Sequence, residues 1–378
     1  MKYLKIVILL IFYSSVIGQE ASLEEAKRLI HSDQFQKAKE VLNTCDEDDC
    51  QYLLADVYYR AGEFLSAKPI LDSLLNNESY AIASHRLLSK IYESEGNVPK
   101  AVSHYSTLAK SDTTNAIYQR KLGNLYHKSG YTLESLASYN KALKLNPKDI
   151  ITISALSEML FTINKIEEAD SIINLGHQLD STNINVQLIR SRIAYKQKKY
   201  QDVTEILRGI RGRIDLDDYS SKILGFSFVK IDSFERAIFT LHKVLLNDPE
   251  AESVLYFLGV AYENLDQPVI AATFYDSALN AGISKQTSLY HRKIADLAED
   301  KKDWPTAINH YKKSLDYEKN PEVYFLLAMA TDNYYKDKST SVRYYKKYIE
   351  SNHDNPQWRK YAKERRNYLK EIAFLKKN

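Results

Sequence analysis

The chain has 378 residues, of which 44% are hydrophobic and 27% are charged, as is ordinary for a globular protein. Its formal charge is only +3, which argues against nucleic acid as a partner because proteins that bind nucleic acid usually have a marked basic excess. Glycine occurs 11 times and proline 8 times, so strong turn signals are few and we expect long helices joined by short turns.

The first expected element is a signal peptide over residues 1–18. Lys2 and Lys5 precede an unbroken apolar run over residues 6–12, and small residues follow it. The run is well short of the ~20 residues that cross a bilayer, so we expect cleavage before Gln19 rather than a retained anchor, which is the alternative. Cleavage removes two lysines and lowers the formal charge from +3 to +1. No later segment approaches spanning length, so we expect export to the periplasm, to the outer membrane or to the medium.

Small residues then recur every 34 residues, and each is followed at fixed distances by a second small or slim residue and by a bulky one. The first small positions are Ser89, Gly123, Ser157, Ser191, Gly225 and Gly259. Twelve residues later stand Ala101, Ser135, Ala169, Val203, Ala237 and Ala271. Four residues further on stand Tyr105, Tyr139, Ile173, Leu207, Leu241 and Tyr275. A period of this length is typical of helix–turn–helix repeats.

This pattern resembles the tetratricopeptide repeat, in which W-x2-L-G-x2-Y is followed by A-x3-F and then by proline. The stretch from Lys121 to Pro147 is the best copy, and Phe257 to Leu279 is nearly as good. No copy has the tryptophan of the family pattern, and the closing proline stands clearly only at Pro147 and Pro249.

The resemblance implies an all-α, right-handed superhelical solenoid of about ten repeats over residues 19–354, with the best copies at 82–283, in an exported bacterial protein. Paired helices can approach closely only where one presents Gly, Ala or Ser, and stacked pairs bury a continuous core that no single pair could bury.

The only two cysteines, Cys45 and Cys50, bracket four acidic residues. Ala26 and Ala55 are 29 residues apart instead of 34, so the turn that holds the cysteines is tight. Disulfides persist in exported compartments, and thiols at the two ends of a helix–helix connection can lie within bonding range. We therefore interpret the pair as a disulfide.

Other roles for these cysteines have less support. Zinc needs four ligands of the Cys or His type, and no histidine is nearer than His31. The acidic run lacks the glycine and the distal glutamate of a calcium loop. The C-x4-C spacing is not that of a thioredoxin-like redox motif. Two free thiols remain as the alternative. We expect no metal and no other cofactor.

In tetratricopeptide proteins, the first helix of each repeat lines a concave groove that receives partners. The resemblance assigns partner-binding positions to Arg86, Lys90, Arg120, Asn124, His127, Lys128, Arg192, Tyr195 and Lys196. Later repeats place acids at equivalent positions, namely Glu263, Asp296, Glu299, Asp300 and Asp332. Arg120 with Asn124 resembles the first pair of the carboxylate clamp of this family, but Ala155 in the next repeat ends the motif. We expect the basic part to bind an acidic or carboxyl-terminated segment of another exported or envelope protein.

Residues 355–378 form a basic segment with apolar residues at helical spacing. Since a solenoid needs a terminal helix that covers its last apolar surface, we expect a capping helix. The alternative is an interfacial helix that contacts anionic lipid or an acidic partner.

Enzyme motifs such as G-x-S-x-G, H-E-x-x-H and a glycine-rich phosphate loop are not present in the sequence. The nine histidines are scattered, and no two of them are spaced i, i+4. We therefore expect a non-enzymatic adaptor of the bacterial cell envelope. A structural envelope component that self-associates is the alternative.

Overall fold

The computed structural model describes residues 22–282, 286–351 and 355–375. The expected signal peptide lies outside these ranges. All regular elements in the described ranges are helices, and a helix over residues 22–31 comes before the others. Their bounds are α2 (Phe35–Leu42), α3 (Asp48–Arg60), α4 (Phe64–Leu74), α5 (Glu78–Ser94), α6 (Val98–Ser111), α7 (Ala116–Lys128), α8 (Thr132–Leu145), α9 (Ile150–Thr162), α10 (Ile166–Leu179), α11 (Ile184–Lys196), α12 (Tyr200–Arg211), α13 (Asp218–Lys230), α14 (Phe234–Leu245), α15 (Glu252–Asn264), α16 (Pro268–Ala281), α17 (Thr287–Asp300), α18 (Trp304–Tyr317), α19 (Pro321–Tyr334), α20 (Ser339–Glu350) and α21 (Pro356–Leu375).

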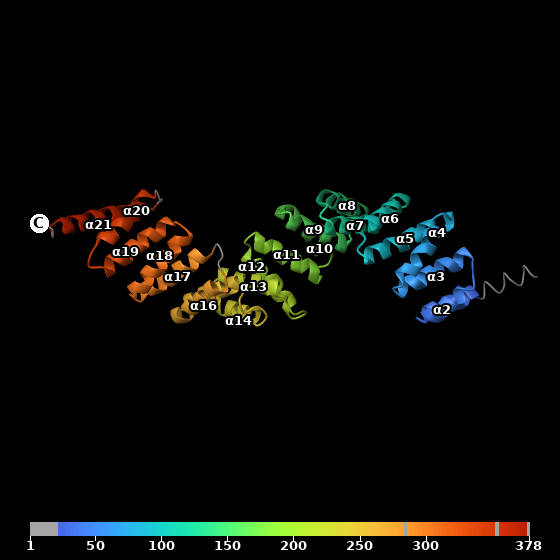
Figure 1. The fold of residues 1–378 in the computed structure, drawn as a ribbon, viewed down its shortest axis with the longest axis horizontal. Coiled ribbons are helices and arrows are strands. Elements are labelled where there is room, and N and C mark those ends of the chain that lie inside the picture. Colours follow the sequence, from blue (N-terminus) through green and yellow to red (C-terminus); the bar gives the residue numbers. More distant parts are fainter. Residues whose placement is uncertain (1–21, 283–285, 352–354, 376–378) are drawn as a thin grey trace, which may run out of the picture. The chain divides into compact units, whose positions relative to one another are not determined.

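The chain divides into two compact units, Met1–Ile189 (unit 1) and Arg190–Asn378 (unit 2), and the boundary falls within α11. Each unit is a row of antiparallel helix hairpins (Figure 1). In unit 1 the second helix of a hairpin packs on the first helix of the next, as α4 does on α5 and α6 on α7. In unit 2, α14 packs on α15 and α18 on α19 in the same way. The described helices make ten hairpins and one terminal helix, which confirms the predicted all-α repeat class.

The small residues of the 34-residue pattern lie where the two helices of a hairpin cross. Ser89, Ser157 and Ser191 are completely buried. A Cβ atom built on Gly225 would lie 2.3 Å from Leu241 Cδ2. One built on Gly259 would lie 2.5 Å from Tyr275 Cε1. Both neighbours are the bulky residues 16 positions later, so the sequence pattern reports a direct contact between the two helices of a hairpin.

The turns inside the hairpins also share a conformation. In nine of the ten described hairpins, one turn residue has a positive φ between 55° and 77°. These residues are Asp33, Gly62, Gly96, Gly130, Asn164, Lys198, Asp232, Asp266 and Lys302. This left-handed region ends a helix tightly and is open to glycine, while Asn and Asp enter it more readily than most other residues. The second helix therefore starts within a few residues of the end of the first.

The terminal helix α21 packs against α20 of the last hairpin. Trp358 stacks on Phe325 of α19 with ring centroids 4.5 Å apart. Ala362 and Leu369 are buried in the same core cluster. Arg365 donates from Nε to Asp332 Oδ2 over 2.7 Å, and Asp332 is only 7% exposed. Apolar packing and the Arg365–Asp332 ion pair thus attach α21 to the last hairpin.

Candidate functional site

The nine residues that the resemblance assigns to partner binding all lie on first helices of hairpins. Six of them are on α5 and α7 in unit 1, and Arg192, Tyr195 and Lys196 belong to unit 2. Arg86 and Lys90 are one helical turn apart on α5, and the equivalent positions of the next repeat are Arg120 and Asn124. Such i, i+4 pairs share one face of a helix.

Two of these six side chains are engaged inside the fold. Arg120 Nε lies 3.1 Å from Asp149 Oδ2, and both side chains are less than one-fifth exposed. Asp149 also accepts the Ile151 N–H as the N-cap of α9, so Arg120 links α7 to the start of α9. Asn124 Oδ1 accepts the Tyr139 hydroxyl at 2.7 Å. The two side chains that resemble the opening of a carboxylate clamp therefore have structural partners.

The other four side chains, Arg86, Lys90, His127 and Lys128, are exposed on α5 and α7, and we call them the basic face. The Lys90 ammonium lies 6.0 Å from the Tyr59 ring on α3. Among the described residues, none of the four forms an ion pair with an acid. The basic face therefore has positive charge available for a ligand.

A hollow of about 400 Å³ lies between the first helices α9 and α11. Ile151 and Ala155 on α9 and Ile189 on α11 supply its apolar wall. Ser154 and Glu158, which also line it, stand at the repeat positions that Arg86 and Lys90 occupy on α5. This hollow was not predicted from the sequence. Ala155 was considered there only as the residue at which the resemblance to the carboxylate clamp stops.

Of the three predicted residues in unit 2, two contact aromatic rings and one is exposed. The Arg192 guanidinium lies 5.8 Å from the Tyr219 ring. Tyr195 packs edge-on against Tyr200, and burial raises the pKa of its hydroxyl. Lys196 is exposed.

Acids on the first helices make internal contacts, both at Glu93, which was not among the expected acidic positions, and at Glu263, which was. Glu93 on α5 accepts the Tyr105 hydroxyl at 2.8 Å and the Lys121 ammonium at 2.9 Å. Burial opposes ionisation of Glu93, but these two hydrogen bonds together lower its pKa. Glu263 accepts Tyr275 and Lys293 in the same way in unit 2. Each network joins both helices of one hairpin to the first helix of the next.

A related contact occurs one repeat later. The Tyr311 hydroxyl lies 2.8 Å from Asp296 Oδ1 and 2.7 Å from Glu299 Oε2. Burial raises the pKa of both carboxyl groups. The sequence signal for these networks is a Glu–Tyr spacing of 12 residues, found at Glu93, Glu263 and Glu299, which was not among the predicted motifs.

Two histidine pairs occupy equivalent places in the repeat and are 19 residues apart in sequence. The Nδ1 atoms of His85 and His104 are 2.8 Å apart, and those of His291 and His310 are 3.1 Å apart. Burial, and then the charge of His310, lower the pKa of His291 to about 4. Since one ring must donate while the other accepts, each pair is suited to neutral imidazoles.

Cys45 and Cys50 are joined in the structure, with an S–S distance of 2.05 Å, and both are buried. They close the turn between α2 and α3, where the Gln51 amide also donates to the Cys45 carbonyl at 2.9 Å. Asp48 and Asp49 lie in the first turn of α3, as expected from the dipole of a helix N-terminus. That the two cysteines are also bonded in the purified protein stays a prediction.

The described part of the chain contains no cluster of three or more His, Cys, Asp or Glu residues that could hold a metal ion. None of its described helices is both long and apolar enough to span a bilayer.

A row of helix hairpins with small residues at the crossings defines a helical repeat protein. Residues 121–149 match the family model described as tetratricopeptide repeat. This match identifies a tetratricopeptide repeat over these residues, and the other described hairpins have the same helix–turn–helix form.

Individual relatives are distant. The chain is 30% identical over 148 residues to the DnaJ homolog subfamily C member 3 of Gallus gallus, covering 38% of this chain and 29% of that protein. It is 31% identical over 128 residues to a TPR repeat-containing protein of Methanocaldococcus jannaschii, covering 31% and 22%. The chain thus spans less than a third of the length of these curated relatives. A solved structure of YrrB, described as a TPR protein with an unusual peptide-binding site, is 16% identical and covers 47% of this chain and 91% of its own, with a TM-score of 0.44.

Proposed function

We propose that this chain is a non-enzymatic adaptor that holds an acidic segment of a partner protein on the basic face of unit 1. Tetratricopeptide repeat proteins are generally scaffolds for protein interactions, and repeat arrays use extended surfaces for this purpose. The observation on which the proposal depends is that Arg86, Lys90, His127 and Lys128 are exposed on α5 and α7 and form no ion pair in the described chain. The charge of Lys128 does help to lower the pKa of Glu93.

The hollow at α9 gives the proposed ligand a second feature. Its wall is apolar at Ile151, Ala155 and Ile189, and the positions that line it continue those of the basic face. A partner segment whose carboxylates pair with the basic face on α5 and α7, and whose next side chain is apolar and enters the hollow at α9, would contact both features. Charges at the rim of such a surface mainly set the association rate and its salt dependence, whereas an apolar anchor in a pocket adds affinity.

The test uses a fluorescent peptide of alternating Asp and Glu that ends in Leu with a free carboxylate. Its anisotropy is titrated with the full chain at low ionic strength. We expect saturable binding, and we expect the double variant Lys90→Glu and Lys128→Glu to bind at least about tenfold more weakly, which corresponds to about 1.4 kcal/mol.

Lys110 on α6 and Lys141 on α8 are exposed and make the matched control. The double variant Lys110→Glu and Lys141→Glu changes the net charge by the same amount on second helices, so it should bind like wild type. Equal weakening by both double variants would mean that the peptide senses only net charge, and the proposal would be withdrawn.

We further propose that the chain is exported and acts in the periplasm or at the outer membrane of a bacterium, with other envelope proteins as partners. The apolar leader over residues 1–18 and the cysteine pair support this location. Cell fractionation followed by N-terminal sequencing should find the chain in the envelope with Gln19 as its first residue. Recovery of the uncleaved chain from the cytosol would contradict it.

A further inference from the structure

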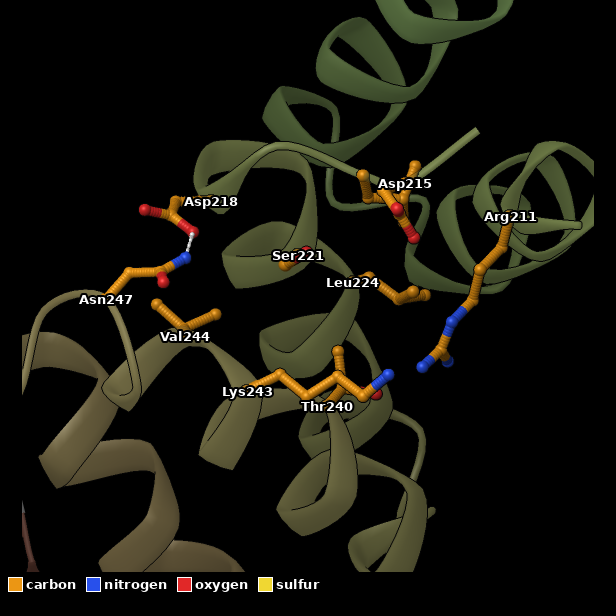
Figure 2. A pocket seen from close by; sticks show the side chains of 10 residues that line it. Arg211, Asp215, Asp218, Ser221, Leu224, Thr240, Lys243, Val244 and Asn247 are labelled. Atoms are coloured by element: carbon orange, nitrogen blue, oxygen red, sulfur yellow. Dashed lines mark hydrogen bonds between the residues drawn. The ribbon is translucent and has the colours of Figure 1, made fainter. Parts of the chain in front are cut away.

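A pocket of about 110 Å³ lies in unit 2 between α12, α13 and α14 (Figure 2). It contains none of the residues that the sequence pattern assigned to binding, and the adaptor proposal does not use it. The residues that line it are Arg211, Asp215, Leu216, Asp218, Ser221, Leu224, Thr240, Lys243, Val244 and Asn247.

Two cations that line the pocket, Arg211 and Lys243, both lie close to the ring of Phe239. The Arg211 guanidinium lies 5.5 Å from the centre of the Phe239 ring, and the Lys243 ammonium lies 5.1 Å from it. Figure 2 shows the two charged ends pointing toward one another beside Thr240. An anion bound between the two cations would offset their mutual repulsion. Neither cation forms an ion pair with any acid in the described part of the chain.

Thr240 adds an unused hydrogen-bonding group at this point. Its side chain is only 3% exposed, and Oγ1 has no hydrogen-bond partner among the described residues. A buried hydroxyl without a partner is costly, so such groups usually meet a ligand or an ordered water. Here the hydroxyl belongs to a residue that lines the pocket next to both cations.

The two acids that line the pocket, Asp215 and Asp218, do not neutralise its two cations. Asp218 Oδ1 accepts the Asn247 amide at 2.9 Å, and Figure 2 shows this pair away from Arg211 and Lys243. Asp215 also lines the pocket, but it makes no ion pair with either cation in the described chain. The cationic end of the pocket therefore remains open to a ligand.

We propose that this pocket binds an oxyanion, meaning the carboxylate or phosphate group of a ligand. Arg211 and Lys243 pair with its oxygens, and the Thr240 hydroxyl donates a third hydrogen bond. Oxyanions favour such sites because charged donors make short and strong hydrogen bonds. A second hollow of about 300 Å³ adjoins the pocket and shares Arg211 and Thr240 with it. Arg208, Arg236 and the exposed Phe239 line this hollow together with the acidic Glu235. The rest of the ligand thus lies against two further arginines, one carboxylate and an aromatic ring.

Calorimetric titration of the full chain with inorganic phosphate and, separately, with acetate tests the site. We expect saturable binding of at least one of the two, and the tighter anion identifies the source as a phosphate or a carboxylate group. Lys243→Ala should weaken that binding at least about tenfold, because one of two charged partners is lost. Lys312→Ala on α18 removes an exposed lysine outside the pocket and should leave the affinity unchanged.

The variant Thr240→Val tests whether the Thr240 hydroxyl binds the anion or instead stabilises the fold. Valine keeps the shape of threonine and removes the unpartnered oxygen, so the melting temperature without anion should not fall, whereas anion affinity should. A lower melting temperature with unchanged affinity would give the hydroxyl a structural role and overturn its part in the site. The whole proposal is overturned if neither anion binds saturably, or if Lys243→Ala binds as wild type does.

Discussion

Gly123 on α7 lies directly against the ring of Tyr139 on α8. A Cβ atom at Gly123 would come within 2.6 Å of Tyr139 Cδ1, closer than real Cβ atoms approach. At the same crossing, the Ser135 hydroxyl donates to the Gly123 carbonyl at 2.9 Å. The absence of a side chain at position 123 thus sets the distance between the two helices of this hairpin.

Adding a side chain at this crossing should destabilise unit 1. We expect Gly123→Ala to lower the free energy of unfolding by about 1–3 kcal/mol, the usual cost of overpacking a close contact. Gly209 on α12 is the control, because a Cβ there would meet nothing within 4 Å. Gly209→Ala should be neutral or stabilising by up to about 1 kcal/mol, since alanine favours the helix. Urea unfolding monitored by circular dichroism measures both variants, and equal effects would contradict the proposed crossing.

Removal of the ion pair that attaches α21 should loosen the last hairpin. Asp332 is nearly buried, so Arg365→Ala leaves its carboxylate with only the Lys338 ammonium, whose Nζ is 3.5 Å from Oδ1. We expect a loss of about 1–3 kcal/mol in the free energy of unfolding. Lys363→Ala, at an exposed position of the same helix, should have almost no effect. If both variants melt alike, Arg365 does not anchor the cap.

Acid should destabilise the hairpin that contains His291 and His310. The pKa of His291 is lowered to about 4 in the folded chain, against about 6.5 when unfolded. The unfolded state therefore binds more protons between these values, so this contribution is fully present above about pH 6.5 and is lost as the pH falls toward 4. Groups facing the pair are His310 itself and, by electrostatic influence, Lys313, Asp316 and Asp276.

The measurement for this prediction is the melting temperature as a function of pH. In wild type the melting temperature should fall as the pH is lowered from 6.5 to 4, and His291→Gln should make that fall shallower. The difference in unfolding free energy is at most about 1.4 kcal/mol per pH unit, the limit for one proton. His127→Gln, at an exposed histidine, should reproduce the wild-type curve. A His291→Gln curve as steep as that of wild type would show that the histidine pair does not cause the acid sensitivity.

Cys45 and Cys50 should be bonded in protein purified from its native compartment. Mass spectrometry after alkylation is expected to find no free thiol until the protein is unfolded with reductant, because both residues are buried. The loop between them is short, so reduction should cost less than the roughly 3 kcal/mol expected for a fifteen-residue loop. Two thiols that alkylate without reductant would refute the bond.

The sequence was most informative where packing restricts residue size. The glycine, serine and alanine positions predicted the helix crossings, because only small side chains fit between closely packed helices. The turns were harder to predict, since the left-handed conformation occurs at Lys198 and Lys302 as well as at glycine and aspartate. Backbone hydrogen bonds within each turn hold this conformation, such as those from the Lys198 N–H to the Tyr195 carbonyl and from the Lys302 N–H to the Glu299 carbonyl.

The candidate site was predicted only in part, because a repeat position does not reveal a side chain's partner. Arg120 and Asn124 hold the expected positions, yet they pair with Asp149 and Tyr139 inside the fold. Tertiary contacts between repeats decide which charges remain exposed. The pocket at Thr240 combines residues from three helices with an unpartnered hydroxyl, and no single-sequence pattern reports such an arrangement.

Hydrogen–deuterium exchange of the full chain, with and without the acidic peptide that ends in Leu, tests the adaptor proposal most directly. We predict slower exchange in α5, α7 and the first turns of α9, with second helices α6 and α8 unchanged. Slower exchange confined to the second helices, or no change anywhere at saturating peptide, would contradict it.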